Sequence, residues 1–290
     1  MVTAMGSTSA HPSVQPISHY ENFPVASVLC PPRLRPAVAA IYHFARTADD
    51  IADEGQVGAA ARLSALRRYR WDLRAVYCGD HHSGRWPQVF GPLEQVIHRF
   101  ELPQALLEAL LSAFMQDVGY THRHKRYATD DALLDYCRRS ANPIGRLLLH
   151  LYGVTDAVSQ AQSDQICTAL QLINFWQDVQ GDIARGRWYL TQQATMQFAV
   201  QDADLQPDSR SPRAAAMIAH HVATARAMMQ GGAPLAHRVP GRAGYELRLV
   251  VQGGLRILDK IAALQYATWQ TRPRLAWWDW PVLLWCAARM

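Results

Sequence analysis

The amino-acid sequence predicts an all-α fold made of a single domain. Apolar residues recur every three to four positions along most of the 290 residues, the spacing of helices with one buried face. The strict alternation of apolar and polar residues that is typical of half-buried strands is nearly absent. No repeat, low-complexity tract or linker divides the chain. We therefore expect one helical domain over residues 16–290 and a disordered tail over residues 1–15.

The expected helices follow one another with short connections. Leu34, Val38, Ile41 and Ala45 mark one face of the first helix, at residues 33–54. Further helices are expected at residues 57–77, 88–100, 103–120, 157–184, 212–230 and 243–270, with loops at 78–87 and 191–213.

One further helix carries its own start and stop signals. Thr129 precedes two aspartates, a pattern typical of an N-cap with an acidic first turn. Pro143 should kink or break this helix, because proline lacks a backbone N–H and clashes with the preceding turn.

Composition favours a large apolar interior and an anionic partner. Hydrophobic residues make up 49% of the chain and charged residues 18%, against roughly 25% charged residues in an average globular protein. A net charge of +5 suits an anionic substrate or an anionic membrane surface. The basic residues are scattered and no nucleic-acid motif surrounds them, so nucleic acid is not an expected partner. Five cysteines without paired spacing indicate reduced thiols in a cytoplasmic protein.

The end of the chain is rich in tryptophan. Residues 275–286 include Trp277, Trp278, Trp280 and Trp285, but no run of roughly 18 apolar residues exists that could span a bilayer. This segment could lie in the interface of the inner membrane surface as a peripheral contact. A terminal helix packed on the core is the alternative, and both remain open.

Two pairs of aspartates at helical spacing are the strongest functional signal. Asp49 and Asp53 form the first pair, and Asp178 and Asp182 the second. Residues four apart share one face of a helix, and both segments are otherwise apolar, so the carboxylates should face inward. There they would raise each other's pKa unless cations compensate them, as Mg²⁺ does when it is bound by carboxylates and substrate phosphates. A single pair is more often a solvated helix face, but two pairs favour a metal site.

Neighbouring polar residues strengthen this interpretation. Asn174 lies one turn before Asp178 and is a further candidate metal ligand, while Arg46 lies one turn before Asp49 and can meet phosphate oxygens. Tyr42 could contact phosphate or serve as a core aromatic. Arg187 could cap the cluster or lie on an exposed helix end. Asp50 and Glu54 should point away from the first pair, toward solvent or a second shell.

Four sequence blocks resemble the squalene/phytoene synthase family. They are His19–Ser27, Ile41–Asp53, Tyr136–Gly145 and Gln171–Asp182, in the family's order and spacing. The resemblance implies an isoprenoid synthase helical bundle with a central active-site cavity. It also implies that the two aspartate motifs hold a cluster of Mg²⁺ ions on a substrate diphosphate.

The resemblance also assigns roles to single residues. Tyr136 matches a catalytic position, and Arg46 and Asn174 match positions that contact the diphosphate or its metal ions. The positions that match the substrate-binding set near the diphosphate or around the isoprenoid chains are His19, Asn22, Phe23, Ile144, Gly145, Leu148, Gln171 and Gln177.

Two departures from the family pattern bear on the reaction. Gln177 stands where members that condense two diphosphates usually carry arginine, and Gly254 where a tyrosine is common. These changes favour an enzyme that ionises one diphosphate, presqualene diphosphate, and captures the cation with water to give hydroxysqualene. Head-to-head condensation of two prenyl diphosphates is the alternative. A non-catalytic lipid-binding or assembly subunit is a third hypothesis, which the four intact aspartates disfavour.

The expected cofactor is Mg²⁺, and no nicotinamide is expected. No glycine-rich dinucleotide fingerprint follows a strand, although this family can bind nicotinamide without one. The resemblance further implies functional coupling to a presqualene diphosphate synthase and to a flavin-dependent reductase.

Overall fold

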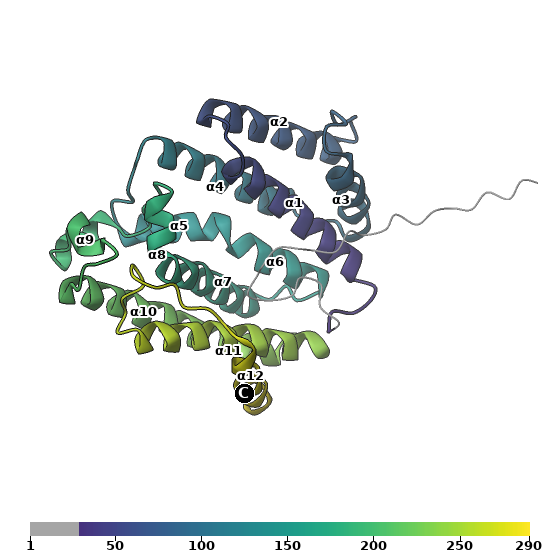
Figure 1. Ribbon diagram of the computed structural model, residues 1–290. Helices are drawn as coiled ribbons and strands as arrows, with labels where there is room; N and C mark the ends of the chain where they lie inside the picture. The colour runs from purple at the N-terminus through teal and green to yellow at the C-terminus, as the bar shows by residue number, and fades with distance from the viewer. Residues whose placement is uncertain (1–28) are drawn as a thin grey trace, which may run out of the picture.

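The structure, a computed structural model, describes residues 29–290, and over that range it consists of helices and loops without strands (Figure 1). The expected all-α class is confirmed. The tail expected at residues 1–15 and the candidate residues His19, Asn22 and Phe23 lie outside the described residues. The α-helices are α1 (Arg35–Asp53), α2 (Ala59–Cys78), α3 (Pro87–Phe100), α4 (Gln104–His122), α5 (Asp130–Ser140), α6 (Asn142–Leu151), α7 (Ala157–Gln177), α8 (Val179–Ala184), α9 (Gln192–Gln197), α10 (Pro212–Gly232), α11 (Arg242–Ala263) and α12 (Trp280–Arg289).

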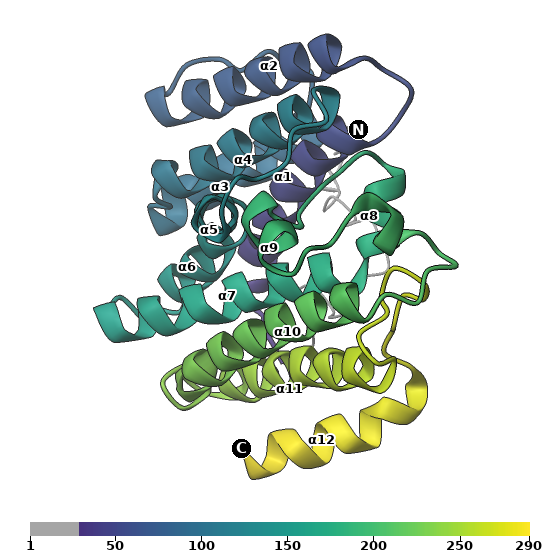
Figure 2. The same cartoon turned by 90° about the vertical axis from the view of Figure 1, so that its left-hand side faces the viewer.

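The helices form a stack of layers. Figure 2 shows the stack running from α2 through α1 and α4, then α5 and α6, α7, and α10 with α11, to α12 at the far end. Two hydrophobic clusters hold the stack together. One is built mainly from α1 to α4, and the other mainly from α5, α7, α10 and α11. The acidic motif of α1 therefore belongs to one cluster and that of α7 and α8 to the other.

Local signals account for several helix ends. The Thr129 hydroxyl accepts a hydrogen bond from the Ala132 backbone N–H at 3.2 Å and begins α5 as predicted. Pro143 lies in the first turn of α6, so the predicted break separates α5 from α6 around Ala141. Proline is tolerated there because its missing N–H would have no helical partner in a first turn.

Three predicted boundaries were wrong. The helix expected at 157–184 is interrupted at Asp178, whose backbone (φ −113°, ψ 28°) separates α7 from α8. The loop expected at 191–213 contains α9, because Thr191 acts as an N-cap and accepts from the Ala194 N–H at 3.1 Å. The helix expected at 243–270 ends at Ala263, and Gln265 and Tyr266 then adopt positive φ, which turns the chain back toward α7.

No helix within residues 29–290 is both long enough and apolar enough to cross a membrane.

Candidate active site

The first acidic motif occupies the last turns of α1. Asp49 and Asp53 lie one turn apart and are both half-buried. Burial, followed by the charge of Asp53, raises the pKa of Asp49 to about 7, while Arg46 and Arg187 act in the opposite direction. The charged form of this pair is therefore costly in the absence of a further cation.

Arg46 is held by the carboxylates that follow it on α1. Its guanidinium lies 3.2 Å from Asp49, 2.7 Å from Asp50 and 2.9 Å from Glu54. Asp50 and Glu54 contact Arg46 instead of joining the Asp49–Asp53 pair, which agrees with the expectation that they lie behind the pair or toward solvent. Burial alone would lower the pKa of Arg46, but these three charges raise it above its ordinary value, and the nearby Tyr42 also contributes. A cation is thus fixed beside the first motif.

The second acidic motif spans the break between α7 and α8. Burial, followed by the charge of Asp178, raises the pKa of Asp182 to about 7, and Arg187 and Arg185 oppose this shift. A Cβ atom at position 181 would lie 2.5 Å from Asp178 Oδ1, so Gly181 leaves room for this carboxylate against α8. Asn174 lies one turn earlier and is exposed. Its backbone carbonyl accepts a hydrogen bond from the Asp178 backbone N–H at 3.0 Å.

Arg187 brings the two motifs together. Its guanidinium forms an ion pair with Asp53 of α1 and lies 3.8 Å from Asp117 of α4. The positive charge of Arg187 partly offsets the burial that raises the pKa values of Asp49 and Asp182. Arg187 therefore interacts electrostatically with both acidic motifs. Only 15% of the side chain is exposed, which excludes the alternative of an exposed helix end.

Two site residues, Asp117 and Tyr189, were not predicted. The Tyr189 hydroxyl donates to Asp117 Oδ1 at 3.0 Å, and both residues are buried. Burial raises the pKa of Asp117 to about 6, against the opposing effect of Arg187. Asp117 is one of only two carboxylates in the mostly apolar α4, which could have signalled it. Nothing in the local sequence marks Tyr189.

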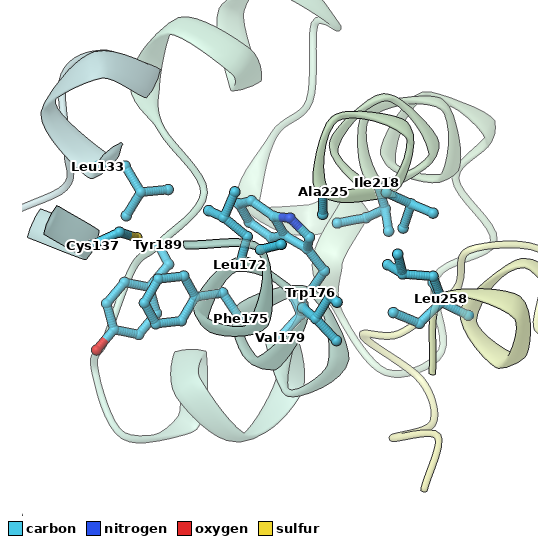
Figure 3. Packing of buried hydrophobic residues seen from close by; sticks show 14 of the residues in the cluster. Leu133, Cys137, Leu172, Phe175, Trp176, Val179, Tyr189, Ile218, Ala225 and Leu258 are labelled. Carbon is cyan, nitrogen blue, oxygen red and sulfur yellow. The ribbon is translucent and has the colours of Figure 1, made fainter. Parts of the chain in front are cut away.

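Aromatic rings form a wall beside these carboxylates. Phe175 and Tyr189 stack with centroids 3.7 Å apart and ring planes at 13°, as Figure 3 shows. The ring of Tyr136 lies 6.1 Å from that of Tyr189 and 6.3 Å from that of Phe175. Burial raises the pKa of Tyr136 well above its ordinary value, so its hydroxyl stays neutral. A small pocket opens here, with Asp182 and Arg187 on its polar side and Phe175, Val179 and Tyr189 on its apolar side.

Comparison with known proteins agrees with this arrangement. The family model for squalene/phytoene synthase matches residues 18–279, which include both acidic motifs and the aromatic wall. The chain belongs to the squalene/phytoene synthase family. Its fold is accordingly the isoprenoid synthase helical fold.

Individual members of the squalene/phytoene synthase family show how close the similarity is. Hydroxysqualene synthase of Zymomonas mobilis is 39% identical over 160 residues, a stretch that covers 54% of this chain and half of that protein's length. Hydroxysqualene synthase of Sinorhizobium fredii is 31% identical over 245 residues, covering 84% of this chain and 79% of that protein. The crystal structure of squalene synthase HpnC from Alicyclobacillus acidocaldarius superposes with a TM-score of 0.76 at 35% identity, covering 86% of this chain and 90% of that one.

The acidic residues of this chain fit Mg²⁺ by their chemistry. Among residues 29–290, no three Asp, Glu, His or Cys side chains converge closely enough to form a metal site by themselves. Arg46, Arg187 and Arg272 instead pair with carboxylates of the motifs. The raised pKa values of Asp49 and Asp182 nevertheless show carboxylates that an added cation would stabilise, and oxygen ligands are those that Mg²⁺ prefers.

Gln177 and Gly145 both contact segments that lie elsewhere in the sequence. Gln177 is buried and donates from its side-chain amide to the Pro273 carbonyl at 2.6 Å, so it joins α7 to the C-terminal segment. A Cβ at Gly145 would clash with Ser163 Oγ and lie 2.6 Å from Cys167 Sγ. Gly145 therefore permits α6 and α7 to pack closely, which is a structural role.

The remaining candidates surround these helices. Ile144 and Leu148 on α6 and Gln171 on α7 are half-buried, and Ile144 packs against the cluster built from α1 to α4. Gly254 lies inside the helix stack, where a Cβ would be 2.7 Å from Met229 Cε and 3.3 Å from Ile173 Cδ1. A larger residue at 254 would have to displace the side chain of Met229.

Proposed function

We propose that this protein ionises presqualene diphosphate and captures the resulting cation with water, giving hydroxysqualene and diphosphate. The observation that carries the proposal is the pairing of two half-buried acidic motifs through Arg187, next to a wall of stacked aromatic rings. The similarity of this chain to two proteins named hydroxysqualene synthase supports this reaction over the others of the family.

The residues divide the work by their chemistry. Asp49, Asp53, Asp178 and Asp182, with Asn174, would hold Mg²⁺, which when bound neutralises charge on the departing diphosphate. Arg46 and Arg187 offer guanidinium groups that bind phosphate oxygens through paired hydrogen bonds. Their present carboxylate partners keep both side chains extended toward the motifs.

The aromatic wall suits the second half of the reaction. A carbocation needs surroundings that exclude bulk water, and the faces of aromatic rings attract cations. Tyr136, Phe175 and Tyr189 supply such faces, and the neutral hydroxyl of Tyr136 gives no negative charge that would trap the cation. One admitted water molecule then forms the new C–O bond and releases a proton.

Head-to-head condensation of two prenyl diphosphates is the second candidate. The structural relative from Alicyclobacillus is named a squalene synthase, which favours this alternative. Against it stands Gln177, whose neutral side chain adds no cation to the diphosphate region and donates to the Pro273 carbonyl. A non-catalytic lipid-binding subunit is the least favoured candidate, since all four aspartates and both arginines are present.

The proposed reaction implies which enzymes act before and after it. A presqualene diphosphate synthase would supply the substrate, and a flavin-dependent reductase would remove the hydroxyl of the product. We also propose that the protein works in the cytoplasm, in peripheral contact with the inner membrane surface, because substrate and product are long hydrocarbons.

The test is a product analysis with separate substrates. Purified protein and Mg²⁺ are supplied either with presqualene diphosphate or with farnesyl diphosphate, in water labelled with oxygen-18 and without nicotinamide. Mass spectrometry should find labelled hydroxysqualene from presqualene diphosphate alone. Rapid conversion of farnesyl diphosphate to a C30 diphosphate or hydrocarbon would establish the condensation reaction instead.

A further inference from the structure

The C-terminal helix α12 is fastened to α11 by one face. Leu283 and Ala287 are buried there, and so is Asp279 just before the helix. The Asp279 carboxylate lies 2.8 Å from Arg256 Nε and 2.5 Å from Lys260 Nζ, both on α11. The helix is therefore held in a fixed orientation at the end of the stack (Figure 2).

The opposite face of α12 and the turn before it expose large apolar side chains. Trp277 is 78% exposed, Trp278 and Trp285 are each 59% exposed, and Trp280 is 43% exposed. Val282 and Leu284 are also exposed, on the two sides of Trp285 around the helix. We call these six residues the tryptophan face. Exposed apolar groups gathered in this way are uncommon on a protein that has no partner for them.

The charge around the tryptophan face has one sign. Between residues 264 and 290 Asp279 is the sole acidic residue, and it is buried and neutralised by two cations. Arg274 and Arg289 are exposed in the same segment, and the Arg289 guanidinium lies 3.8 Å from the centroid of the Trp285 ring. The surface presented outward is therefore apolar and cationic.

We propose that the tryptophan face docks into the headgroup region of a bilayer that contains anionic lipids, with α12 lying in the membrane plane. Tryptophan prefers this depth because its ring is apolar and its N–H is polar, and basic residues are attracted to anionic headgroups. A second copy of the chain fits the face less well, since it would bring the arginines of the two copies together. In this arrangement one face of α12 packs on α11 and the other contacts lipid. The two alternatives for the C-terminal segment, packing on the core and lying in the membrane interface, then both hold.

The docked helix leads directly to the active site. Arg272, five residues before Trp277, lies 3.4 Å from Asp178, and the Pro273 carbonyl accepts the Gln177 amide. Docking would therefore hold the second acidic motif close to the bilayer, from which a long hydrocarbon substrate enters. This benefit rests on the proposed function, whereas docking itself can be measured without any substrate.

The experiment is sedimentation of the full-length protein with vesicles. Phosphatidylcholine vesicles are compared with mixed phosphatidylcholine and phosphatidylglycerol vesicles, at low and at high salt. We expect binding to the mixed vesicles that high salt weakens. Combined Trp277→Ala, Trp278→Ala and Trp285→Ala substitution should lower the partition coefficient about tenfold or more. Combined Arg274→Gln and Arg289→Gln substitution should lower it about fivefold per arginine, or about 1 kcal/mol each.

Trp71→Ala provides the matched control, because Trp71 is 55% exposed on α2, at the other end of the stack. It should leave vesicle binding unchanged, and thermal melts should show that the triple tryptophan variant still folds. Equal loss of binding in Trp71→Ala, or unchanged binding in the triple variant, would overturn the proposal. So would a wild-type protein that ignores anionic vesicles but forms a dimer that the triple variant cannot form. A failure to make hydroxysqualene would leave the vesicle result intact.

Discussion

Arg187, on the loop after α8, forms an ion pair with Asp53 at the end of α1, and its charge also opposes the burial that raises the pKa of Asp182 in the second acidic motif. The guanidinium also faces Asp117, so three elements meet at one buried cation. Burial alone would lower the pKa of Arg187, but the hydrogen bond and charge of Asp53 raise it above its ordinary value. Arg187 thus supplies part of the positive charge that these carboxylates require.

Removing this cation should destabilise the protein as well as stop turnover. Arg187→Gln leaves Asp53 and Asp117 without their partner, and we expect a loss of about 3 kcal/mol in the free energy of unfolding, measured in urea. Mg²⁺ should restore part of that loss by replacing the missing charge. Arg185→Gln is the control, because Arg185 is an exposed arginine two residues away. Equal destabilisation by both substitutions would contradict the bridging role.

Substitution of an aspartate in either acidic motif should lower activity without lowering stability. Asp49→Asn and Asp178→Asn each keep the side-chain shape but remove a charge needed to bind Mg²⁺, so turnover should fall about a hundredfold or more. Without metal, Asp49→Asn should keep or raise the melting temperature, because burial and Asp53 disfavour the charged carboxylate. Asp208→Asn, in an exposed loop, should change neither quantity. Near-normal turnover in both site variants, or activity that survives chelation, would refute the metal-binding role.

Gly145 should be required for packing rather than for contact with substrate. Gly145→Ala puts a methyl group against Ser163 and Cys167, and overpacking of this kind costs about 1–3 kcal/mol. Replacing Ser163 and Cys167 by alanine in the same chain should recover much of the loss. Gly119→Ala is the control, because its added Cβ in α4 meets only the end of the flexible, exposed Arg123 side chain, and it should stabilise by up to about 1 kcal/mol. Undiminished stability of Gly145→Ala in chemical denaturation would show that the two helices can separate there.

His221 should make stability depend on pH. Burial, with a smaller effect of His220, lowers the pKa of His221 from 6.5 to about 4, and its ring stacks on Trp176 with centroids 4.3 Å apart. Because the folded pKa lies below the unfolded one, the stabilisation is complete above pH 6.5 and is lost as the pH falls toward 4. The loss should be on the order of 3 kcal/mol.

The corresponding measurement is urea unfolding at several pH values across this range. His221→Phe keeps a ring on Trp176 and should remove the contribution of His221 between pH 6.5 and 4. The contribution of opposite sign from the raised pKa values of Asp49, Asp117 and Asp182 is common to both proteins, so the difference between wild type and variant is the quantity compared. His220→Phe, on an exposed neighbour, should retain the slope. If the free energy of unfolding of His221→Phe depends on pH as that of the wild type does, the acid sensitivity belongs to other groups.

Features that depend on neighbours along the chain could be read from the sequence. Helical periodicity, the Thr129 cap and the Pro143 break identified the elements within a few residues, because they act through the backbone of one or two turns. Asp49, Asp53 and Arg46 could be placed on one face in the same way, since residues three or four apart share a helix face, whereas Asp178 lies at the break between α7 and α8. The inward direction of the aspartates followed from the apolar residues around them.

Features that depend on contacts between distant segments were decided by the tertiary structure alone. The return of the chain after Ala263 brings Pro273 to Gln177, whose side-chain amide donates to the Pro273 carbonyl. Asp117 and Tyr189 become partners, and Arg187 meets Asp53, because α4, α1 and the loop after α8 pack against one another. Local spacing carries no information about such pairs. Their positions follow from how the two hydrophobic clusters fit together, because burial of each apolar face fixes which polar side chains meet between them.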